Sequence, residues 1–235
     1  MKFIFLFGMP GSGKTTLIKN ITSMFNIHPI VNLIDDLIQK DSIYIKKVKD
    51  ILKKCKTKCL KNPSIKTYKA FENAYWYTRK NGCKRKNCKS KIMKISPSGC
   101  DCLNDQKLLN ALKDKKDIIF ETASTSSPEW LFSLIPKEYE IIFFINLAHL
   151  DTIIKRTQGR FYKEVLAFNG TIAPRLPRSD KLYLLEKQKH IYKMLMNLLT
   201  RKERIIVYDN ESNTILYDGK SKIGLKKIIN PFFKN

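Results

Sequence analysis

The run Lys2-Phe3-Ile4-Phe5-Leu6-Phe7, followed by Gly8-Met9-Pro10-Gly11-Ser12-Gly13-Lys14-Thr15, decides the fold of this chain. The first six residues are mostly apolar, which predicts a strand buried on both faces of a parallel sheet. The next eight match the phosphate-loop pattern G-x-x-x-x-G-K-[ST]. The glycines let successive backbone N–H groups curl around an anion, and the helix that follows points its positive end at the same anion.

This loop predicts a site for a nucleoside triphosphate, ATP or GTP. We expect Lys14 to reach the β- and γ-phosphates and the Thr15 hydroxyl to ligate Mg²⁺. The expected nucleotide-binding residues are Gly8, Pro10, Gly11, Ser12, Gly13, Lys14, Thr15 and Thr16.

The length and apolar pattern predict one intracellular, soluble domain. A chain of 235 residues can bury a full α/β core. The N-terminal apolar run resembles a short signal peptide, but cleavage after it would destroy the phosphate loop. No window has the length of a membrane span. We therefore expect a cytoplasmic protein that does not bind a membrane.

The net charge of +24 is concentrated in one part of the chain. Between Lys40 and Lys94 there are 19 Lys or Arg against three acids, a net +16. Such a segment must face solvent or an anion, because lysines are not buried in such numbers. Six aromatic residues lie in it, and five of them leave a nucleic-acid partner open: Tyr68, Phe71, Tyr75, Trp76 and Tyr77.

Helical and strand patterns alternate along the chain, which predicts a three-layer α/β fold of the P-loop NTPase kind with a central parallel sheet. Strands are expected at His28–Ile34, Asp117–Phe120, Tyr139–Leu147 and Arg204–Tyr208. Helices are expected at Thr15–Phe25, Ile43–Cys59, Ser64–Lys80, Asp105–Lys115, Pro128–Leu134, His149–Arg160 and Ser179–Leu199. We read residues 1–235 as a single kinase domain, with a basic, cysteine-rich insertion at about 55–103 and a helical lid at about 150–180.

Acidic residues follow two of the predicted strands. Asp35 and Asp36 end the second strand, at the edge where open α/β sheets bind ligands. We predict that Asp35 is the base that takes a proton from a substrate hydroxyl, and that Asp36 caps a helix or contacts the substrate. Glu121 and Thr122 end the third strand, where Glu121 could hold Mg²⁺ through water or bind a substrate hydroxyl.

The few arginines gather in the expected lid. Arg156 and Arg160 lie four residues apart on one helix, and Arg175 and Arg178 follow in a proline-containing loop. Because the chain otherwise uses lysine, this concentration favours bidentate phosphate contacts over a solvated basic helix. Arg156 and Arg175 are the expected catalytic arginines.

Several segments in order resemble the zeta-toxin group of P-loop kinases. They are Gly-Met-Pro-Gly-Ser-Gly-Lys-Thr-Thr, Leu-Ile-Asp-Asp, Ile-Ile-Phe-Glu-Thr, Ile-Ile-Lys-Arg, Pro-Arg-Leu-Pro and Val-Tyr-Asp-Asn. The resemblance implies an alcohol-phosphorylating kinase, with Asp35 as base and Arg156 and Arg175 on the phosphates. It implies substrate contacts from Glu121 and Thr122, and from Asp105 at the position of a family glutamate. For zeta toxins proper the acceptor is the sugar of UDP-N-acetylglucosamine.

Six cysteines lie within 48 residues, with spacings that match no standard zinc finger. In a reducing compartment disulfides are not expected, which leaves a structural Zn²⁺ site, a redox role or ordinary buried residues. The candidate zinc ligands are Cys83, Cys88, Cys100 and Cys102.

These observations predict a phosphotransferase that uses ATP or GTP with Mg²⁺ and an alcohol group as acceptor. The first expected acceptor class is a nucleotide-sugar or another small hydroxyl compound. A polynucleotide 5′-hydroxyl kinase and a nucleic-acid-binding NTPase module without a phosphorylated product are the alternatives.

Overall fold

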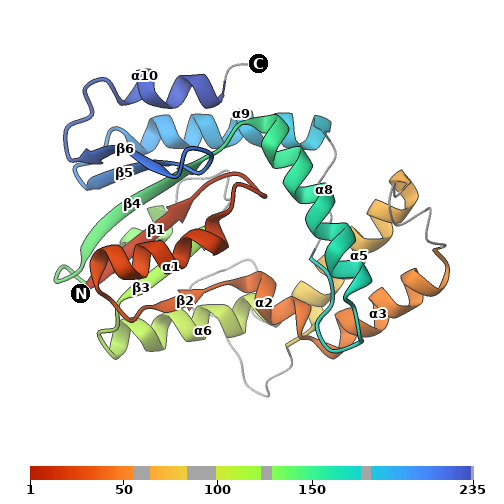
Figure 1. The fold of residues 1–235 in the computed structure, drawn as a ribbon. Coiled ribbons are helices and arrows are strands. Elements are labelled where there is room, and N and C mark those ends of the chain that lie inside the picture. The colour runs from red at the N-terminus through yellow and green to blue at the C-terminus, as the bar shows by residue number, and fades with distance from the viewer. Residues whose placement is uncertain (56–63, 84–98, 123–128, 176–180, 234–235) are drawn as a thin grey trace. The chain divides into compact units, whose positions relative to one another are not determined.

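The computed structural model describes residues 1–55, 64–83, 99–122, 129–175 and 181–233. The chain divides into two compact units (Figure 1). The sheet unit comprises Met1–Asn32, Ala111–Thr157 and Arg178–Asn235, and the helical unit comprises Leu33–Asn110 and Gln158–Pro177. The single kinase domain with an insertion and a lid stays a prediction.

Six strands of the described chain form one mostly parallel sheet in the order β2-β3-β1-β4-β5-β6 (Figure 1). They are β1 (Lys2–Phe7), β2 (Ile30–Asn32), β3 (Ile118–Thr122), β4 (Glu140–Leu147), β5 (Arg204–Asp209) and β6 (Thr214–Gly219). Only β6 runs antiparallel to its neighbour, β5. The predicted α/β class with a parallel sheet is thereby confirmed, and β1 lies between β3 and β4.

The two faces of the sheet carry different side chains because alternate residues of each strand point to opposite sides. On one face, Leu17 and Ile21 of α1 (Lys14–Phe25) pack against Ile4 and Leu6 of β1. Aromatic rings fill the opposite face, where Phe132 of α7 (Glu129–Phe132) lies 5.1 Å from the ring of Phe5. Full burial of each such side chain contributes about 1.5–3 kcal/mol.

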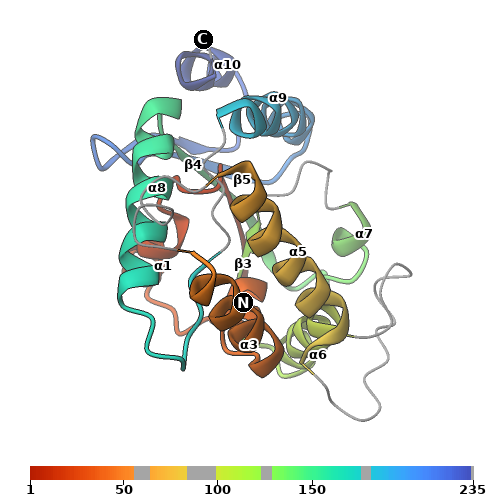
Figure 2. The same cartoon turned by 90° about the vertical axis from the view of Figure 1, so that its right-hand side faces the viewer.

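The C-terminal part of the sheet unit is helical. Figures 1 and 2 show α10 (Leu225–Ile229) beside α9 (Lys181–Leu198). A 3₁₀ turn, η1 (Asn230–Phe232), follows α10, and the buried amide of Gln188 on α9 donates a 2.9 Å hydrogen bond to the Phe232 carbonyl. No helix in the described part of the chain is long and apolar enough to cross a membrane.

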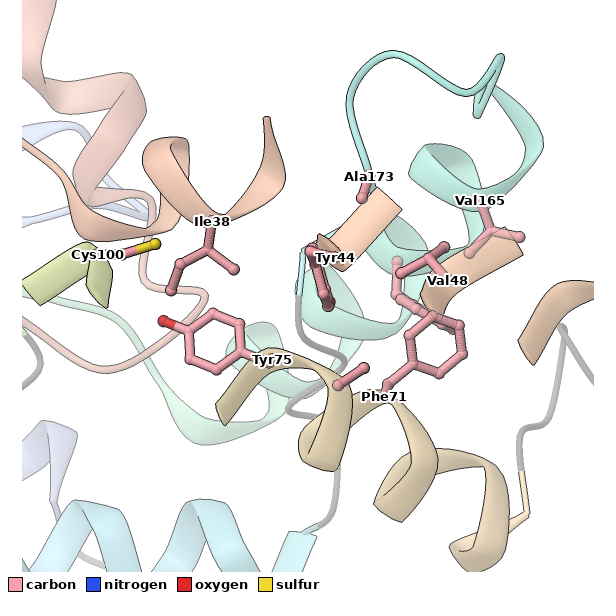
Figure 3. Packing of buried hydrophobic residues seen from close by; sticks show 10 residues of the cluster. Ile38, Tyr44, Val48, Phe71, Tyr75, Cys100, Val165 and Ala173 are labelled. Carbon is pink, nitrogen blue, oxygen red and sulfur yellow. The ribbon is translucent and has the colours of Figure 1, made fainter. Parts of the chain in front are cut away.

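The helical unit has its own core, to which helices and one loop contribute (Figure 3). It contains α2 (Ile34–Gln39), α3 (Ser42–Lys53), α5 (Ile65–Asn81), most of α6 (Gly99–Lys113) and the second half of α8 (Leu150–Leu166). The buried residues of the cluster are Ile38, Tyr44, Val48, Phe71, Ala74, Tyr75, Cys100, Phe161, Val165 and Ala173. In Figure 3, Val48, Phe71 and Val165 gather beside Tyr44.

The structure corrects several predicted elements. The strand predicted at His28–Ile34 ends at Asn32, and α2 begins at Ile34, so Asp35 and Asp36 lie in the first turn of a helix. The helix predicted at Asp105–Lys115 begins earlier than expected, because α6 starts at Gly99. A Cβ at this glycine would lie 2.4 Å from the carbonyl oxygens of Arg79 and Lys80, and its φ is +83°, so both space and backbone require glycine. The strand β6 and helix α10 were not predicted.

Candidate functional site

The phosphate loop in the sheet unit has the backbone that its glycines predict. Gly11 and Gly13 adopt φ values of +83° and +91°, a region that side chains with a Cβ rarely occupy. Gly13 is the N-cap of α1, and a Cβ there would meet the side chain of Asn210 at 2.7 Å. Asn210, which follows β5, therefore lies against this loop, directly beside the start of α1. Of the other residues predicted to bind the nucleotide, Pro10 is half-buried and Thr16 is exposed.

Lys14 is 5% exposed, and its ammonium group is held at the loop itself. It donates to the carbonyl oxygens of Gly8 at 2.9 Å and Met9 at 3.0 Å. Its Nζ also lies 3.8 Å from a carboxylate oxygen of Glu121. A buried ammonium requires such partners, since burial without them would be costly. The positive charge is therefore fixed where phosphate oxygens are expected.

Glu121 joins the loop to the neighbouring strand β3. Its second carboxylate oxygen accepts a 3.1 Å hydrogen bond from the Thr15 hydroxyl. The register of the sheet places Glu121 opposite Leu6 and Thr122 opposite Phe7, at the carboxyl ends of the two strands. A hydroxyl and a carboxylate at this separation are hard oxygen donors of the kind that Mg²⁺ prefers. The residues present thus fit Mg²⁺, with Thr15 and Glu121 as the groups that would hold it.

Asn146 on β4 supports the loop from the other side and was missed from the sequence. It is 1% exposed, and its amide donates to the carbonyl oxygen of Ser12 at 2.8 Å and to the Ser12 hydroxyl at 3.3 Å. A polar residue inside the otherwise apolar run of β4 is the signal that could have found it. Its amide oxygen is buried with no hydrogen-bond partner among the described residues.

Arg156 on the first half of α8 also belongs to this site. Its guanidinium donates to the side-chain oxygen of Asn210 at 2.6 Å and reaches the Ser12 carbonyl at 3.5 Å. Asn210 itself is fixed by a backbone hydrogen bond to Leu147. Asn210, which follows β5, and Ser12 of the loop thus hold the Arg156 guanidinium at the phosphate loop. The sheet unit brings together Lys14, Thr15, Glu121 and Arg156 from the predicted set.

Asp35 belongs to the helical unit. Its side chain is exposed, and one carboxylate oxygen accepts a 2.6 Å hydrogen bond from the hydroxyl of Tyr75 on α5. Asp36 is half-buried in the same turn of α2. It is not the cap, since Leu33 holds the N-cap position without a side-chain hydrogen bond. Two carboxylates in a first helical turn are favoured by the positive end of the helix.

Two of the arginines predicted in the lid, Arg160 and Arg175, share one acid that the sequence did not indicate. A Glu164 oxygen lies 3.9 Å from Nε of Arg160, one turn away on α8, and 3.4 Å from Nε of Arg175. The other Glu164 oxygen accepts a 2.7 Å hydrogen bond from the Arg175 backbone N–H. Glu164 therefore binds the Arg175 backbone through a hydrogen bond and its side chain through an ion pair. Arg178 lies outside the described residues.

Asp105 has an environment that differs from that of an open substrate contact. It lies on α6 with its side chain 5% exposed. Glu164, Asn146 and Asn210 were absent from the predicted set, and Tyr75 was named only as a possible stacking residue. The contacts of Tyr75, Asn146 and Asn210 join elements far apart in the sequence.

The cysteines correct the expectation that disulfides are absent. Cys83, after α5, and Cys100, at the start of α6, form a disulfide across a sequence separation of 17 residues. Cys55 and Cys102 are disulfide-bonded as well. Asp41, Cys83 and Cys100 lie close enough to share a metal ion, but the sulfur atoms of Cys83 and Cys100 are bonded to each other in the disulfide. A zinc site at these residues would need reduced thiols and stays a prediction, and Cys88 lies outside the described residues.

Comparison with known proteins supports the fold. No protein-family model matches the chain, and no curated protein matches it. A solved structure from the PezAT chromosomal toxin–antitoxin system of Streptococcus pneumoniae has a TM-score of 0.55 and 14% identity, covering 100% of this chain and 77% of that one. The predicted resemblance to zeta-toxin-like P-loop kinases is confirmed at the level of fold.

Two further solved structures were found with lower scores. Deoxyadenosine kinase from M. mycoides with bound dATP has a TM-score of 0.39 and 14% identity, covering 100% of both chains. An uncharacterized protein from Eubacterium ventriosum has a TM-score of 0.31 and 14% identity, covering 99% of this chain and 97% of that chain.

Proposed function

We propose that this protein is a nucleoside-triphosphate-dependent phosphotransferase that moves the γ-phosphoryl group to an alcohol. The observation that carries the proposal is the arrangement of Lys14, Thr15 and Glu121 at the end of β1 and β3. A fixed ammonium, a hydroxyl and a carboxylate at a glycine-rich loop are the groups that bind a nucleotide with its Mg²⁺. The fold likeness to a zeta-toxin-like kinase supports the same class.

Each proposed group has one task. Lys14 binds the β- and γ-phosphates, and the loop N–H groups bind their oxygens. Thr15 and Glu121 would hold Mg²⁺, which would supply positive charge against the phosphates. Asp35 accepts the proton of the acceptor hydroxyl, whose oxygen then forms the new bond to the γ-phosphorus as the nucleoside diphosphate leaves. Arg156 and Arg175 stabilise the charge that develops on the transferred group, and Arg160 is a further phosphate contact.

A small hydroxyl compound such as a nucleotide-sugar is the first acceptor class, with Asp36, Asp105, Glu121 and Thr122 as the proposed contacts. The support for this class is the resemblance to zeta toxins. The burial of Asp105 weakens its part in recognition, because an acceptor would have to reach a side chain that is 5% exposed.

A nucleic-acid acceptor is the second candidate, and the outer side of α5 favours it. Of the six aromatic residues in the basic segment, Tyr44, Phe71 and Tyr75 are buried, whereas Trp76 is 46% and Tyr77 51% exposed. Each exposed ring has a cation over it: Arg79 lies 5.0 Å from the Trp76 ring, and Lys47 lies 4.1 Å from that of Tyr77. Exposed rings beside cations can bind single strands by stacking and charge.

Arg79 is held in place for such a role. Burial lowers the pKa of its guanidinium, but hydrogen bonds of 2.8–3.0 Å to both carboxylate oxygens of Asp101 and the charge of that group outweigh this and raise the pKa. The guanidinium therefore remains charged while its plane is fixed beside Trp76.

The test is transfer of label from γ-labelled ATP or GTP to a panel of UDP-sugars, nucleosides and 5′-hydroxyl oligonucleotides. The proposal expects one acceptor class to become labelled with Mg²⁺ present. Labelling of oligonucleotides that weakens steeply with salt, through roughly five or more phosphate contacts, would select the second candidate. Release of inorganic phosphate with no labelled acceptor in the panel would contradict transfer and favour an NTPase module.

A further inference from the structure

Two tyrosines at the centre of the helical unit contact the segments that carry proposed catalytic groups. Tyr75 is 3% exposed, and its hydroxyl donates to the Asp35 carboxylate at 2.6 Å. This is the distance of a charge-assisted hydrogen bond, which is stronger and more directional than a neutral one. The buried ring thus carries its hydroxyl to an exposed carboxylate.

Tyr44 on α3 is fully buried and makes the corresponding contact with the loop after α8. Its hydroxyl donates to the carbonyl oxygen of Pro174 at 3.2 Å, directly before Arg175. The same loop is held by a 2.9 Å backbone hydrogen bond from Ala173 to the Gln39 carbonyl at the end of α2. The position of Arg175 therefore depends on both α2 and α3.

The two tyrosine rings also contact each other. Their centroids are 6.2 Å apart and their planes meet at 85°, an edge-to-face arrangement that adds about 0.5–1.5 kcal/mol beyond burial. Figure 3 shows both rings in the cluster, with Ile38 of α2 close to Tyr75. Because the rings are packed on each other and on α2, the two hydroxyls have little freedom to move apart.

We propose that Tyr75 and Tyr44 are positioning residues, Tyr75 for Asp35 and Tyr44 for Arg175. The inference rests on the proposed phosphotransferase function. The core could be filled by phenylalanine in both places, as it is at Phe71 and Phe161, whose rings pack edge-to-face 5.1 Å apart. The hydroxyls are therefore the part of each tyrosine that the packing alone does not need. Tyr75 orients the base toward the acceptor hydroxyl, and Tyr44 fixes the backbone from which Arg175 extends.

The main experiment removes one hydroxyl while keeping the ring. Tyr75→Phe should lower kcat about 10- to 100-fold and leave KM for the nucleotide unchanged, because a displaced base slows only the chemical step. In an Asp35→Asn background the same substitution should have little further effect, since the group it orients has lost its function. Tyr183→Phe, the same change at a half-buried site on α9 that has no part in the proposed mechanism, is the control and should act like the wild type.

Tyr44→Phe gives the second arm. It should lower kcat less than Tyr75→Phe does, because it acts through the backbone, and it should have little further effect in an Arg175→Ala background. Independent, multiplicative effects of the paired substitutions on kcat would overturn positioning and leave the tyrosines as packing residues. Wild-type kcat in Tyr75→Phe would overturn the role of that residue outright.

Unfolding measurements keep the inference separate from the proposed function. The Tyr75→Phe and Asp35→Asn substitutions should be non-additive in the free energy of unfolding if the hydrogen bond exists in solution. Additive values overturn the contact and with it the inference. Non-additive unfolding together with a wild type that labels no acceptor would overturn the phosphotransferase proposal and the catalytic purpose of the tyrosine, while the contact itself would stand.

Discussion

The sheet unit and the helical unit hold their proposed functional groups in different ways. In the sheet unit, Lys14 and Thr15 belong to one continuous motif, and the motif's own carbonyl groups and Glu121 fix them. In the helical unit, Asp35 and Arg175 lie 140 positions apart in the sequence and are held by side chains of other elements, Tyr75 and Glu164. The phosphate-loop groups are thus held mostly by residues of the same motif, whereas the position of Asp35, the proposed base, depends on contacts between helices.

The strongest test of the role of the phosphate loop is Lys14→Ala. Phosphoryl transfer should fall below detection while the protein stays folded, because the ammonium is bound at the loop and does not fill the apolar core. Label transfer and circular dichroism measure the two quantities, and Lys19→Ala, at an exposed site on the same helix, is the control. Full turnover by folded Lys14→Ala protein would refute the kinase assignment.

The arginines compare the two units directly. Arg156→Ala in the sheet unit and Arg175→Ala in the helical unit should each lower kcat, by about 10³-fold for an arginine that stabilises the transferred group. Glu164→Gln should lower kcat less and have little further effect in the Arg175→Ala protein, because it only loosens that residue. Lys155→Ala, beside Arg156 but exposed, is the control in steady-state assays. An Arg175→Ala variant with normal kcat would leave catalysis to Arg156.

Asp35→Asn tests whether the proposed base acts in the chemical step without contributing to nucleotide affinity. It should lower kcat by roughly 10²-fold or more with little change in nucleotide affinity, because only activation of the acceptor is lost. Steady-state kinetics and nucleotide titration provide both values. Asp36→Asn is the matched comparison, and a larger effect there would transfer the role of base to Asp36.

Glu121→Gln tests the Mg²⁺ site. The amide keeps the size of the side chain and removes its charge, so the Mg²⁺ concentration for half-maximal activity should rise roughly 10- to 100-fold. A Mg²⁺ titration of label transfer measures this change. Glu138→Gln, an exposed acid in the same unit, should leave the Mg²⁺ dependence unaltered.

The smallest expected effect on activity comes from the disulfide in the helical unit. Replacing Cys83 and Cys100 by serine opens a loop with a sequence separation of 17 residues, which should cost about 3 kcal/mol of unfolding free energy. Denaturant unfolding would measure the loss, and nucleotide affinity should stay as in the wild type. Equal stability of the double variant and the untreated wild type would show that the bond does not form.

Local patterns predicted the sheet unit well. The apolar run of β1, the eight-residue loop and the strands ending in Glu121 and Leu147 could be read from neighbouring residues. Their order gave the mostly parallel sheet. The strand β6 was missed because its side chains are largely exposed and its three apolar residues, Ile215-Leu216-Tyr217, do not alternate with polar ones.

The helical unit was harder to predict because its elements depend on distant partners. The apolar residues around β2 read as one long strand, although the chain turns into α2 after Leu33. The start of α6 at Gly99 depends on the close approach of the α5 carbonyl groups, and the residues next to Gly99 in the sequence do not indicate this contact. For the same reason Tyr75 was read as one of several possible stacking residues, and Glu164 was not singled out at all.

The contacts of Lys14 make nucleotide binding an exchange reaction. Its ammonium already has the Gly8 and Met9 carbonyls and the Glu121 carboxylate as partners, so phosphate oxygens must compete with ligands supplied by the protein. Under the proposed function, Glu121 would compete with the nucleotide for Lys14 when Mg²⁺ is absent and would assist nucleotide binding when Mg²⁺ is bound. The divalent ion would then decide the sign of the contribution that this one carboxylate makes to affinity.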